Sequence, residues 1–283
     1  MSRNWNGVHV VIIGAARQGL ALARYLAQRG ARVTLTDQRP AAQLEGARAA
    51  LTGLEITWVV GGHPLSLLDG CDLLCLSGGV PLTLPVVQQA IAAGIPLTND
   101  SQLFMEAVPC PVIGITGSAG KTTTTTLVGR MAQSALQPPR KVWVGGNIGL
   151  PLIEFLDQMK PEDLVILELS SFQLELMTIS PHIAAILNIT PNHLDRHVTL
   201  EAYTAAKANI LTHQRPTDIA ILGQDDPGAW SLASAVVGQC ISFGLRRPAG
   251  NQVGNFVADG KLWLQTDAST AELMDAAIIR LRG

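Results

Sequence analysis

The chain has 283 residues, of which 47% are hydrophobic and 15% are charged, and its formal net charge is −2. This length fits about two domains, and the composition supplies apolar residues for buried cores while arguing against long disordered segments. The small net charge gives no electrostatic basis for binding nucleic acid or an anionic membrane. No run of about 18 apolar residues occurs, so we predict no membrane span. We also expect a cytoplasmic protein that acts as a monomer.

The four cysteines (Cys71, Cys75, Cys110 and Cys240) are irregularly spaced and have no accompanying cluster of His or Cys. This spacing argues against a zinc site and against a disulfide framework. We therefore expect reduced cysteines.

Strand and helix signals alternate over the first hundred residues. Five short apolar runs predict strands at residues 8–14, 32–37, 56–60, 72–77 and 95–100. Amphipathic stretches at residues 17–30 and 85–94 predict helices between them. This alternation predicts a parallel sheet with helices on its faces.

A glycine loop, Gly14-x-Ala16-x-x-Gly19, follows the first predicted strand and opens a helix, and Asp37 ends the next strand. In dinucleotide sites such a loop binds the pyrophosphate and the acidic residue binds the ribose hydroxyls. Ala16 replaces the second glycine, which weakens the case for NAD. Plain βαβ packing, a nucleotide diphosphate and NAD therefore remain as alternatives. Arg17 and Arg39 lie near this loop and either meet phosphates or are surface arginines.

The pattern starts again near residue 100. A short connecting helix is predicted at residues 101–108, with Asp100 as its N-cap. Further strands are predicted at residues 109–116, 165–171, 182–190 and 218–223, and a hairpin at 255–265 turns at Asp259-Gly260. We predict two α/β domains, residues 1–100 and residues 101–283.

A second glycine loop, residues 117–122, lies between a predicted strand and a predicted helix. The usual P-loop pattern requires glycine at position 115, where this chain has Ile115. Even so, convergent backbone N–H groups and a helix N-terminus predict a phosphate site. Lys121 would reach the β- and γ-phosphates, and the hydroxyl of Thr122 would bind Mg²⁺. The alternative is a Gly/Thr-rich surface turn.

Four further groups are candidates for a site. Glu168 follows a buried strand, where its carboxylate either holds Mg²⁺ or faces water. A polar cluster with His193, Asp195 and His197 follows the next strand and is either functional or an ordinary loop. Lys207 lies among small residues of a predicted helix, and Asn147 lies in the glycine-rich turn at residues 145–151.

Five motifs occur together in this order: ITGSAGKTT, GGNIGLP, LELSSFQLE, NITPNHLDRH and AYTAAKANI. Together they resemble the Mur ligases, the ATP-dependent amide ligases of peptidoglycan synthesis. The run LELSSFQL is most similar to the members that join D-glutamate to UDP-N-acetylmuramoyl-L-alanine. The resemblance implies a Rossmann-like N-terminal domain that binds the UDP substrate, followed by a P-loop-type mononucleotide-binding central domain, with ATP and Mg²⁺ as cofactors. In this family the phosphate loop lacks the upstream glycine, so Ile115 is no defect.

The resemblance also implies roles for individual residues. Lys121, His193 and Lys207 are the implied catalytic residues, and Thr122, Glu168, His193 and Lys207, if carbamylated, are the implied metal ligands. The ATP site would comprise Gly117, Ser118, Ala119, Gly120, Lys121, Thr122 and Thr123. The substrate site would comprise Arg17, Gln18, Asp37, Arg39, Ser77, Gly79, Asn147 and Ser170.

Several features depart from the family pattern. Ala119 stands where many members have asparagine, Asn192 where they often have aspartate, and residues 76–80 read LSGGV instead of the usual Ser-Pro-Gly. The family also has a third, C-terminal domain, and the chain ends about where the central domain enters its last helix. We therefore expect the 283-residue polypeptide alone to be inactive as a ligase. The alternatives are another Mur or folylpolyglutamate-type ligase, a NAD-dependent oxidoreductase, and a P-loop switch that forms no bond.

Overall fold

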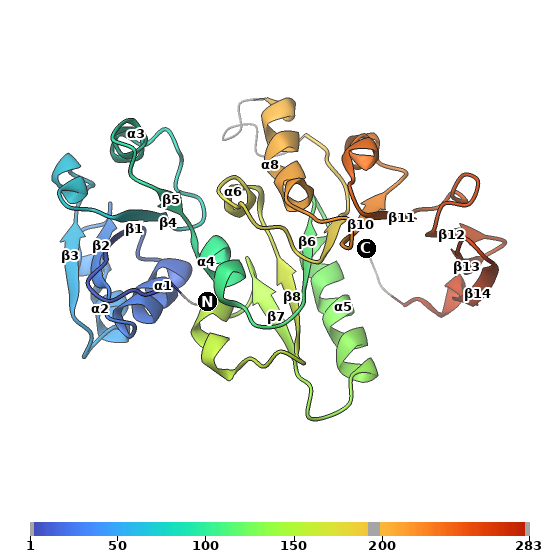
Figure 1. Cartoon of the computed structure of the whole chain (residues 1–283), viewed down its shortest axis with the longest axis horizontal. Helices are drawn as coiled ribbons and strands as arrows, with labels where there is room; N and C mark the ends of the chain where they lie inside the picture. Colours follow the sequence, from blue (N-terminus) through green and yellow to red (C-terminus); the bar gives the residue numbers. More distant parts are fainter. Residues whose placement is uncertain (1–2, 192–198, 281–283) are drawn as a thin grey trace. The chain divides into compact units, whose positions relative to one another are not determined.

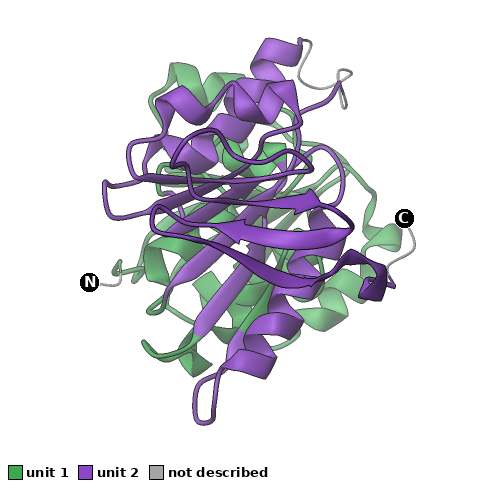
Figure 2. Ribbon diagram, turned by 90° about the vertical axis from the view of Figure 1, so that its right-hand side faces the viewer, with its two compact units in different colours: residues 1–110, 143–163, 171–179 green, residues 111–142, 164–170, 180–283 purple. Residues whose placement is uncertain are grey.

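The computed structural model describes residues 3–191 and 199–280, and its chain forms two compact units. Unit 1 comprises residues 1–110, 143–163 and 171–179, and unit 2 comprises residues 111–142, 164–170 and 180–283 (Figure 2). The predicted division at residue 100 stays a prediction. Among the described residues, no helix is both long enough and apolar enough to span a bilayer.

Unit 1 contains a five-stranded parallel sheet, shown in blue to blue-green in Figure 1. The strands are β1 (His9–Ile13), β2 (Arg32–Asp37), β3 (Ile56–Val60), β4 (Leu73–Leu76) and β5 (Leu97–Thr98). Their order is β3-β2-β1-β4-β5. The order reverses between β1 and β4, and ligands of open α/β sheets bind beyond the carboxyl ends of the strands at such a reversal.

Three helices of unit 1 lie where helices were predicted: α1 (Arg17–Ala27), α3 (Pro85–Ala92) and α4 (Asp100–Ala107). The unit also contains helices α2 (Glu45–Ala50) and α6 (Ser171–Leu174), with 3₁₀ turns η1 (Ala41–Gln43), η2 (Leu65–Leu68) and η3 (Leu152–Gln158). The predicted N-cap of α4 is wrong by one residue. The side chain of Asn99 accepts the backbone N–H of Gln102, and Asp100 is the first helical residue.

Two later segments of the chain complete unit 1. The Asn99 Nδ2 donates to the carbonyl of Gln173 at 2.7 Å, and Gln102 exchanges hydrogen bonds with Thr178. Arg24 on α1 forms an ion pair with Glu154 on η3. Side chains of β1, β4 and α3 fill one part of the core: Val11, Ile13, Leu74, Leu76, Val86, Val87 and Ala90.

A second sheet has the order β14-β13-β12-β11-β10-β9-β6-β8-β7, and its strands lie in unit 2 except for β7, of which residues 143–146 belong to unit 1. Its first four strands are β6 (Val112–Thr116), β7 (Val142–Gly146), β8 (Leu164–Glu168) and β9 (Ile183–Ile186). The others are β10 (Ile219–Gly223), β11 (Gln239–Phe243), β12 (Gly254–Ala258), β13 (Lys261–Gln265) and β14 (Thr270–Asp275). Strands β8, β6, β9, β10, β11 and β12 are parallel neighbours. Buried residues such as Val112, Ile166, Ala184 and Leu222 explain why the central strands read as apolar runs.

The remaining elements of unit 2 are helices α5 (Lys121–Ala135), α8 (Leu200–Thr212) and α9 (Pro227–Trp230), with 3₁₀ turns η4 (Ala233–Ala235) and η5 (Ala276–Ile278). The predicted hairpin is confirmed, because β12 and β13 pair antiparallel on either side of Asp259-Gly260. Both turn residues have positive φ, as a tight hairpin turn requires.

Candidate functional site

The second glycine loop joins β6 to α5, as predicted, and its residues form a cradle at the start of the helix. Lys121 folds back over the loop, with its Nζ donating to the carbonyl of Gly117 at 2.8 Å. The first backbone N–H groups of α5 have no partner within a helix, and the helix dipole adds partial positive charge there. This combination is a ready anion site.

Asn188, which follows β9, holds the glycine loop in place. Its backbone carbonyl accepts the N–H of Ser118 at 3.0 Å, and its Oδ1 accepts the N–H of Ala119 at 2.8 Å. Its Nδ2 donates to the carbonyl of Ala119 at 3.2 Å. Two of the predicted ATP-binding N–H groups, those of Ser118 and Ala119, are therefore engaged within the protein.

The side chain of Ser118 is a second fixed point of the loop. Its hydroxyl donates to the carbonyl of Thr190 at 3.0 Å and accepts the backbone N–H of Thr190, also at 3.0 Å. The hydroxyl of Tyr203 on α8 donates to the same oxygen at 3.2 Å, and the Tyr203 side chain is fully buried. The sequence analysis missed Asn188 and Tyr203, although both lie within its motifs.

Thr122 and Glu168 meet at the start of α5. The Thr122 hydroxyl donates to the Glu168 carboxylate at 2.9 Å, and Glu168 is the buried last residue of β8. Hydroxyl and carboxylate oxygens are ligands that Mg²⁺ accepts, with phosphate oxygens and water completing its octahedron. The described residues contain no group of three or more His, Cys, Asp or Glu side chains placed to hold a metal ion. The predicted ligand His193 lies outside the described residues.

Lys207 points from α8 into the same cradle. Its Nζ donates to the carbonyl of Gly117 at 3.0 Å and to the hydroxyl of Thr116 at 3.3 Å, and it lies 4.7 Å from the centre of the Tyr203 ring. The residue is 1% exposed. Burial and the nearby Lys121 lower the pKa of Lys207 to about 7. The site therefore carries a buried amine that is partly neutral at physiological pH.

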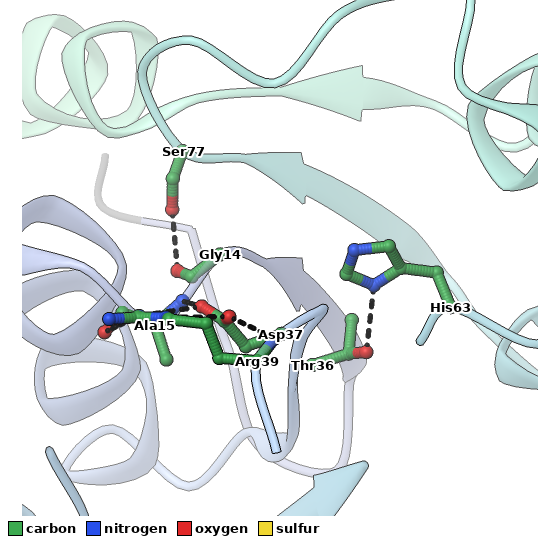
Figure 3. A network of polar contacts seen from close by, with 7 residues as sticks. All are labelled: Gly14, Ala15, Thr36, Asp37, Arg39, His63 and Ser77. Atoms are coloured by element: carbon green, nitrogen blue, oxygen red, sulfur yellow. Dashed lines mark hydrogen bonds and ion pairs between the residues drawn. The ribbon is translucent and has the colours of Figure 1, made fainter. Parts of the chain in front are cut away.

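In unit 1 the first glycine loop lies at the carboxyl edge of the sheet (Figure 3). Asp37 accepts the N–H of Ala15 at 2.8 Å and forms an ion pair with Arg39 at 2.8 Å. Hydrogen bonds from Arg39 hold the pKa of Asp37 well below its usual range. The structure thus brings two predicted substrate residues together as a pair anchored to the loop.

The other predicted substrate residues of unit 1 lie around the same loop. The hydroxyl of Ser77 donates to the carbonyl of Gly14 at 2.8 Å, and the side chain of Gln18 lies against Gly78. The Arg17 guanidinium donates to the carbonyl of Asn147 at 3.3 Å. Gly79 follows Ser77 in the loop after β4, whereas Ser170 belongs to unit 2, two residues after Glu168.

Figure 3 also shows a histidine at this edge that the sequence analysis missed. The Nδ1 of His63 lies 2.9 Å from the hydroxyl of Thr36, and that hydroxyl lies 3.1 Å from the carbonyl of Gly62. A sequence signal was available, because the tetrad Gly61-Gly62-His63-Pro64 directly follows β3.

Comparison with known families matches both parts of the chain. Residues 115–274 match the family described as "Mur ligase middle domain". The chain belongs to the Mur ligase family. Residues 8–99 match "Mur ligase MurD-like, N-terminal domain". These two matches confirm the predicted resemblance. They also argue against the two alternatives of a NAD-dependent oxidoreductase and a P-loop switch.

Three relatives with the curated name UDP-N-acetylmuramoylalanine–D-glutamate ligase show the extent of the similarity. The protein of Symbiobacterium thermophilum is 39% identical over 272 residues, which are 96% of this chain and 59% of the relative. That of Koribacter versatilis is 40% identical over 278 residues, or 98% and 60% of the two chains. That of Anaeromyxobacter dehalogenans is 42% identical over 244 residues, or 86% and 52%. The chain therefore spans little more than half the length of these relatives.

Solved structures of Mur ligases share the fold. The UDP-N-acetylmuramate:L-alanyl-γ-D-glutamyl-meso-diaminopimelate ligase of Neisseria meningitides superposes with a TM-score of 0.56 at 18% identity, covering 97% of this chain and 89% of that one. A murein peptide ligase of Psychrobacter arcticus gives a TM-score of 0.54 at 19% identity, covering 95% and 61%. At this identity the likeness concerns the fold alone, and it confirms the predicted α/β class.

Proposed function

We propose that the chain contains the UDP-substrate and ATP-binding parts of an ATP-dependent ligase that joins D-glutamate to UDP-N-acetylmuramoyl-L-alanine. The observation that carries this proposal is the identity of about 40% with curated D-glutamate ligases, which extends over nearly the whole chain. The paired Thr122 and Glu168 beside the phosphate loop support it from the structure.

The proposed reaction starts with transfer of the γ-phosphoryl group of ATP to the carboxylate of the substrate. This step converts a poor leaving group into phosphate. The amine of D-glutamate then attacks the acyl phosphate, and the tetrahedral intermediate collapses to the amide and releases phosphate. Two anions must approach each other in the first step, so Lys121 and the N-terminus of α5 have to neutralise charge on the phosphates.

A magnesium ion would supply further charge neutralisation at the phosphates. Thr122 and Glu168 fit this ion, because the structure places two oxygen donors side by side at the start of α5. We assign His193 to a second metal by its place in the motif alone.

Lys207 is proposed to react with CO₂. Its amine would form an N–C bond to the carbon of CO₂ and release a proton, which gives a carbamate that can serve as an oxygen ligand. A pKa of about 7 leaves part of the amine neutral and nucleophilic near pH 7. Because the side chain is buried beside the loop carbonyls, the product carbamate would form next to the bound phosphates.

Calorimetric titration of the 283-residue polypeptide tests the proposal. We expect saturable binding of UDP-N-acetylmuramoyl-L-alanine and of UDP to unit 1, binding of Mg-ATP to unit 2, and no binding of NAD. A Lys121→Ala variant should lose Mg-ATP binding and keep UDP binding. Binding of NAD without UDP would contradict the assignment of unit 1, and Mg-ATP binding that is unchanged in Lys121→Ala would contradict that of unit 2.

A further inference from the structure

The glycine-rich turn at residues 145–151 packs closely against the 3₁₀ turn η3 that follows it. Strand β7 ends at Gly146, where the backbone turns with a φ of +103°. A Cβ atom at Gly145 would lie 2.7 Å from the Cγ of Leu152 and 2.8 Å from the carbonyl oxygen of Leu150. This packing leaves no room for one more methyl group, so a shift of η3 displaces the turn.

Within unit 1, helix α1 contacts this segment through the arginines in its first and last turns. At the first residue of the helix, the guanidinium of Arg17 donates to the carbonyl of Asn147 at 3.3 Å. About two turns further along, Arg24 forms an ion pair with Glu154 in the first turn of η3. The same guanidinium donates to the carbonyl of Ala50, the last residue of α2. Arg24 therefore joins α1 to both α2 and η3, which fixes where η3 lies along the helix.

The ion pair between Arg24 and Glu154 lies partly inside the protein. The exposed fractions of the two side chains are 35% and 22%, so water and salt screen their attraction less than on an open surface. A second ion pair, between Arg29 and Asp157, also reaches η3, but the side chain of Asp157 is 80% exposed. Solvent screens this second pair more strongly. The pair formed by Arg24 therefore contributes more to the position of η3.

The contact between Arg17 and Asn147 places the glycine-rich turn beside the N-terminus of α1. In the proposed function this end of the helix binds the diphosphate of UDP-N-acetylmuramoyl-L-alanine, and Asp37 lies on the side of the ribose. The muramoyl-alanine group is attached to the other end of the diphosphate, so it is the part of the substrate that extends toward Asn147. UDP lacks this group. The position of the turn therefore affects binding of the whole substrate and not binding of UDP.

We propose that Arg24 and Glu154 are positioning residues for the muramoyl-alanine end of the substrate. They act through η3 and the turn that carries Asn147, and neither of them touches the substrate. This inference rests on the proposed function, because it concerns the substrate assigned to unit 1. When the ion pair is broken, η3 and the turn move relative to the N-terminus of α1, and the protein loses its preference for the whole substrate over UDP. A role in stability alone would change the two affinities together.

Calorimetric titration of the 283-residue polypeptide with UDP-N-acetylmuramoyl-L-alanine and with UDP tests this proposal. The unsubstituted protein should bind the whole substrate more tightly than UDP. Arg24→Glu and Glu154→Arg each place two like charges side by side, so the affinity for the whole substrate should fall about threefold to tenfold, with UDP binding unchanged. The double variant restores an ion pair in the opposite orientation and should recover most of the preference.

A milder variant keeps the test decisive if either charge reversal does not fold. Glu154→Gln removes only the charge and should lower the affinity for the whole substrate about twofold, again without an effect on UDP.

Asp157 provides a matched control, because it also pairs with an arginine at the end of α1 but is mostly exposed. Asp157→Arg should leave both affinities unchanged. The proposal would be overturned by an equal loss of both ligands in the Glu154 variants, by an unchanged preference in every variant, or by equal affinities of the unsubstituted protein for the two ligands. Failure of the unsubstituted protein to bind UDP would refute the proposed function of unit 1 and this inference with it.

Discussion

At the residue scale, the amide of Asn188 holds the second glycine loop in place. Its side chain bonds both the N–H and the carbonyl of Ala119, and its backbone bonds Ser118. We predict that Asn188→Ala weakens Mg-ATP binding about tenfold, because the loop must then be ordered by the ligand. Asn188→Asp should weaken it further, since a carboxylate would repel the phosphates and cannot donate to Ala119. Calorimetric titration with Mg-ATP measures both effects.

UDP binding is the internal control for the Asn188 variants, because unit 1 contains none of the affected bonds. It should be unchanged in both. If Asn188→Asp bound Mg-ATP as tightly as Asn188→Ala, charge at this position would not matter and the phosphates would lie elsewhere.

A buried carboxyl group in unit 1 makes stability depend on pH. Asp100 is buried, and burial raises its pKa to about 6 against partly compensating hydrogen bonds. The folded state therefore holds this proton more tightly than the unfolded state, so stability falls as pH rises from about 4 to about 6. The difference between the pKa of Asp100 in the folded state and its ordinary value of 3.8 corresponds to about 3 kcal/mol of unfolding free energy. We predict that Asp100→Asn stabilises the protein by up to this amount at pH 7.5 and little at pH 4.

Urea unfolding at both pH values measures the effect of Asp100→Asn. Glu45→Gln on the surface of α2 is the control, and it should change stability little at either pH. The prediction would be wrong if Asp100→Asn were less stable than the unsubstituted protein at pH 7.5. In that case the N-terminus of α4 and Arg17 would stabilise the ionised carboxylate more than burial penalises it.

At the residue scale, sequence motifs identified chemically distinctive groups but not the side chains that hold the loops in place. Asp37 and Lys121 were predictable from their spacing to a glycine loop, and Glu168 from its place at the end of a buried strand. Asn188, Tyr203 and His63 hold their loops through contacts that depend on strand order, which a motif does not contain. The pairing of Asp37 with Arg39 was likewise absent from the motif.

At the scale of elements, the contact between α1 and β1 depends on Gly19. A Cβ atom at this position would lie 1.9 Å from the carbonyl oxygen of Gly14 and 2.6 Å from the Ser77 hydroxyl. We predict that Gly19→Ala pushes α1 away from the glycine loop, destabilises unit 1 by about 1–3 kcal/mol and weakens UDP binding. Thermal unfolding and UDP titration measure the two effects.

Gly46 on α2 is the matched control for Gly19, because it is helical and has no atom within 4 Å of an added Cβ. Gly46→Ala should be neutral or stabilising by about 0.5–1 kcal/mol. Equal stability of the two variants would show that α1 can shift without cost.

Strands and longer helices were predictable from the sequence, because the apolar side chains that they bury recur with the period of the element. The runs at β1, β2 and β3 are apolar, and the hairpin at Asp259-Gly260 combines alternation with turn residues. The short helix α6 and the 3₁₀ turn η3 gave no such signal, since four to seven residues are too few for a helical period. Their membership of unit 1 follows from tertiary contacts alone.

At the scale of the whole molecule, unit 1 is assembled from three separate segments of the chain. The turn η3 packs against α1 and α4, and its residues Leu152, Ile153 and Leu156 are buried. Burial of each such side chain contributes about 1.5–3 kcal/mol, and together they approach the total stability of a typical domain. The bonds from Asn99 to Gln173 and from Gln102 to Thr178 add buried polar contacts that residues 1–110 cannot make alone.

We therefore predict that a polypeptide of residues 1–110 lacks a cooperative thermal transition and binds hydrophobic dyes, although it contains the whole five-stranded sheet. Calorimetric melting of this fragment and of the 283-residue polypeptide provides the comparison. Addition of UDP should raise the melting temperature of the longer polypeptide, because a ligand that binds only the folded state stabilises it, and should have no effect on the fragment. A fragment that melts cooperatively and responds to UDP would mean that residues 143–163 and 171–179 only cover a unit that is already complete.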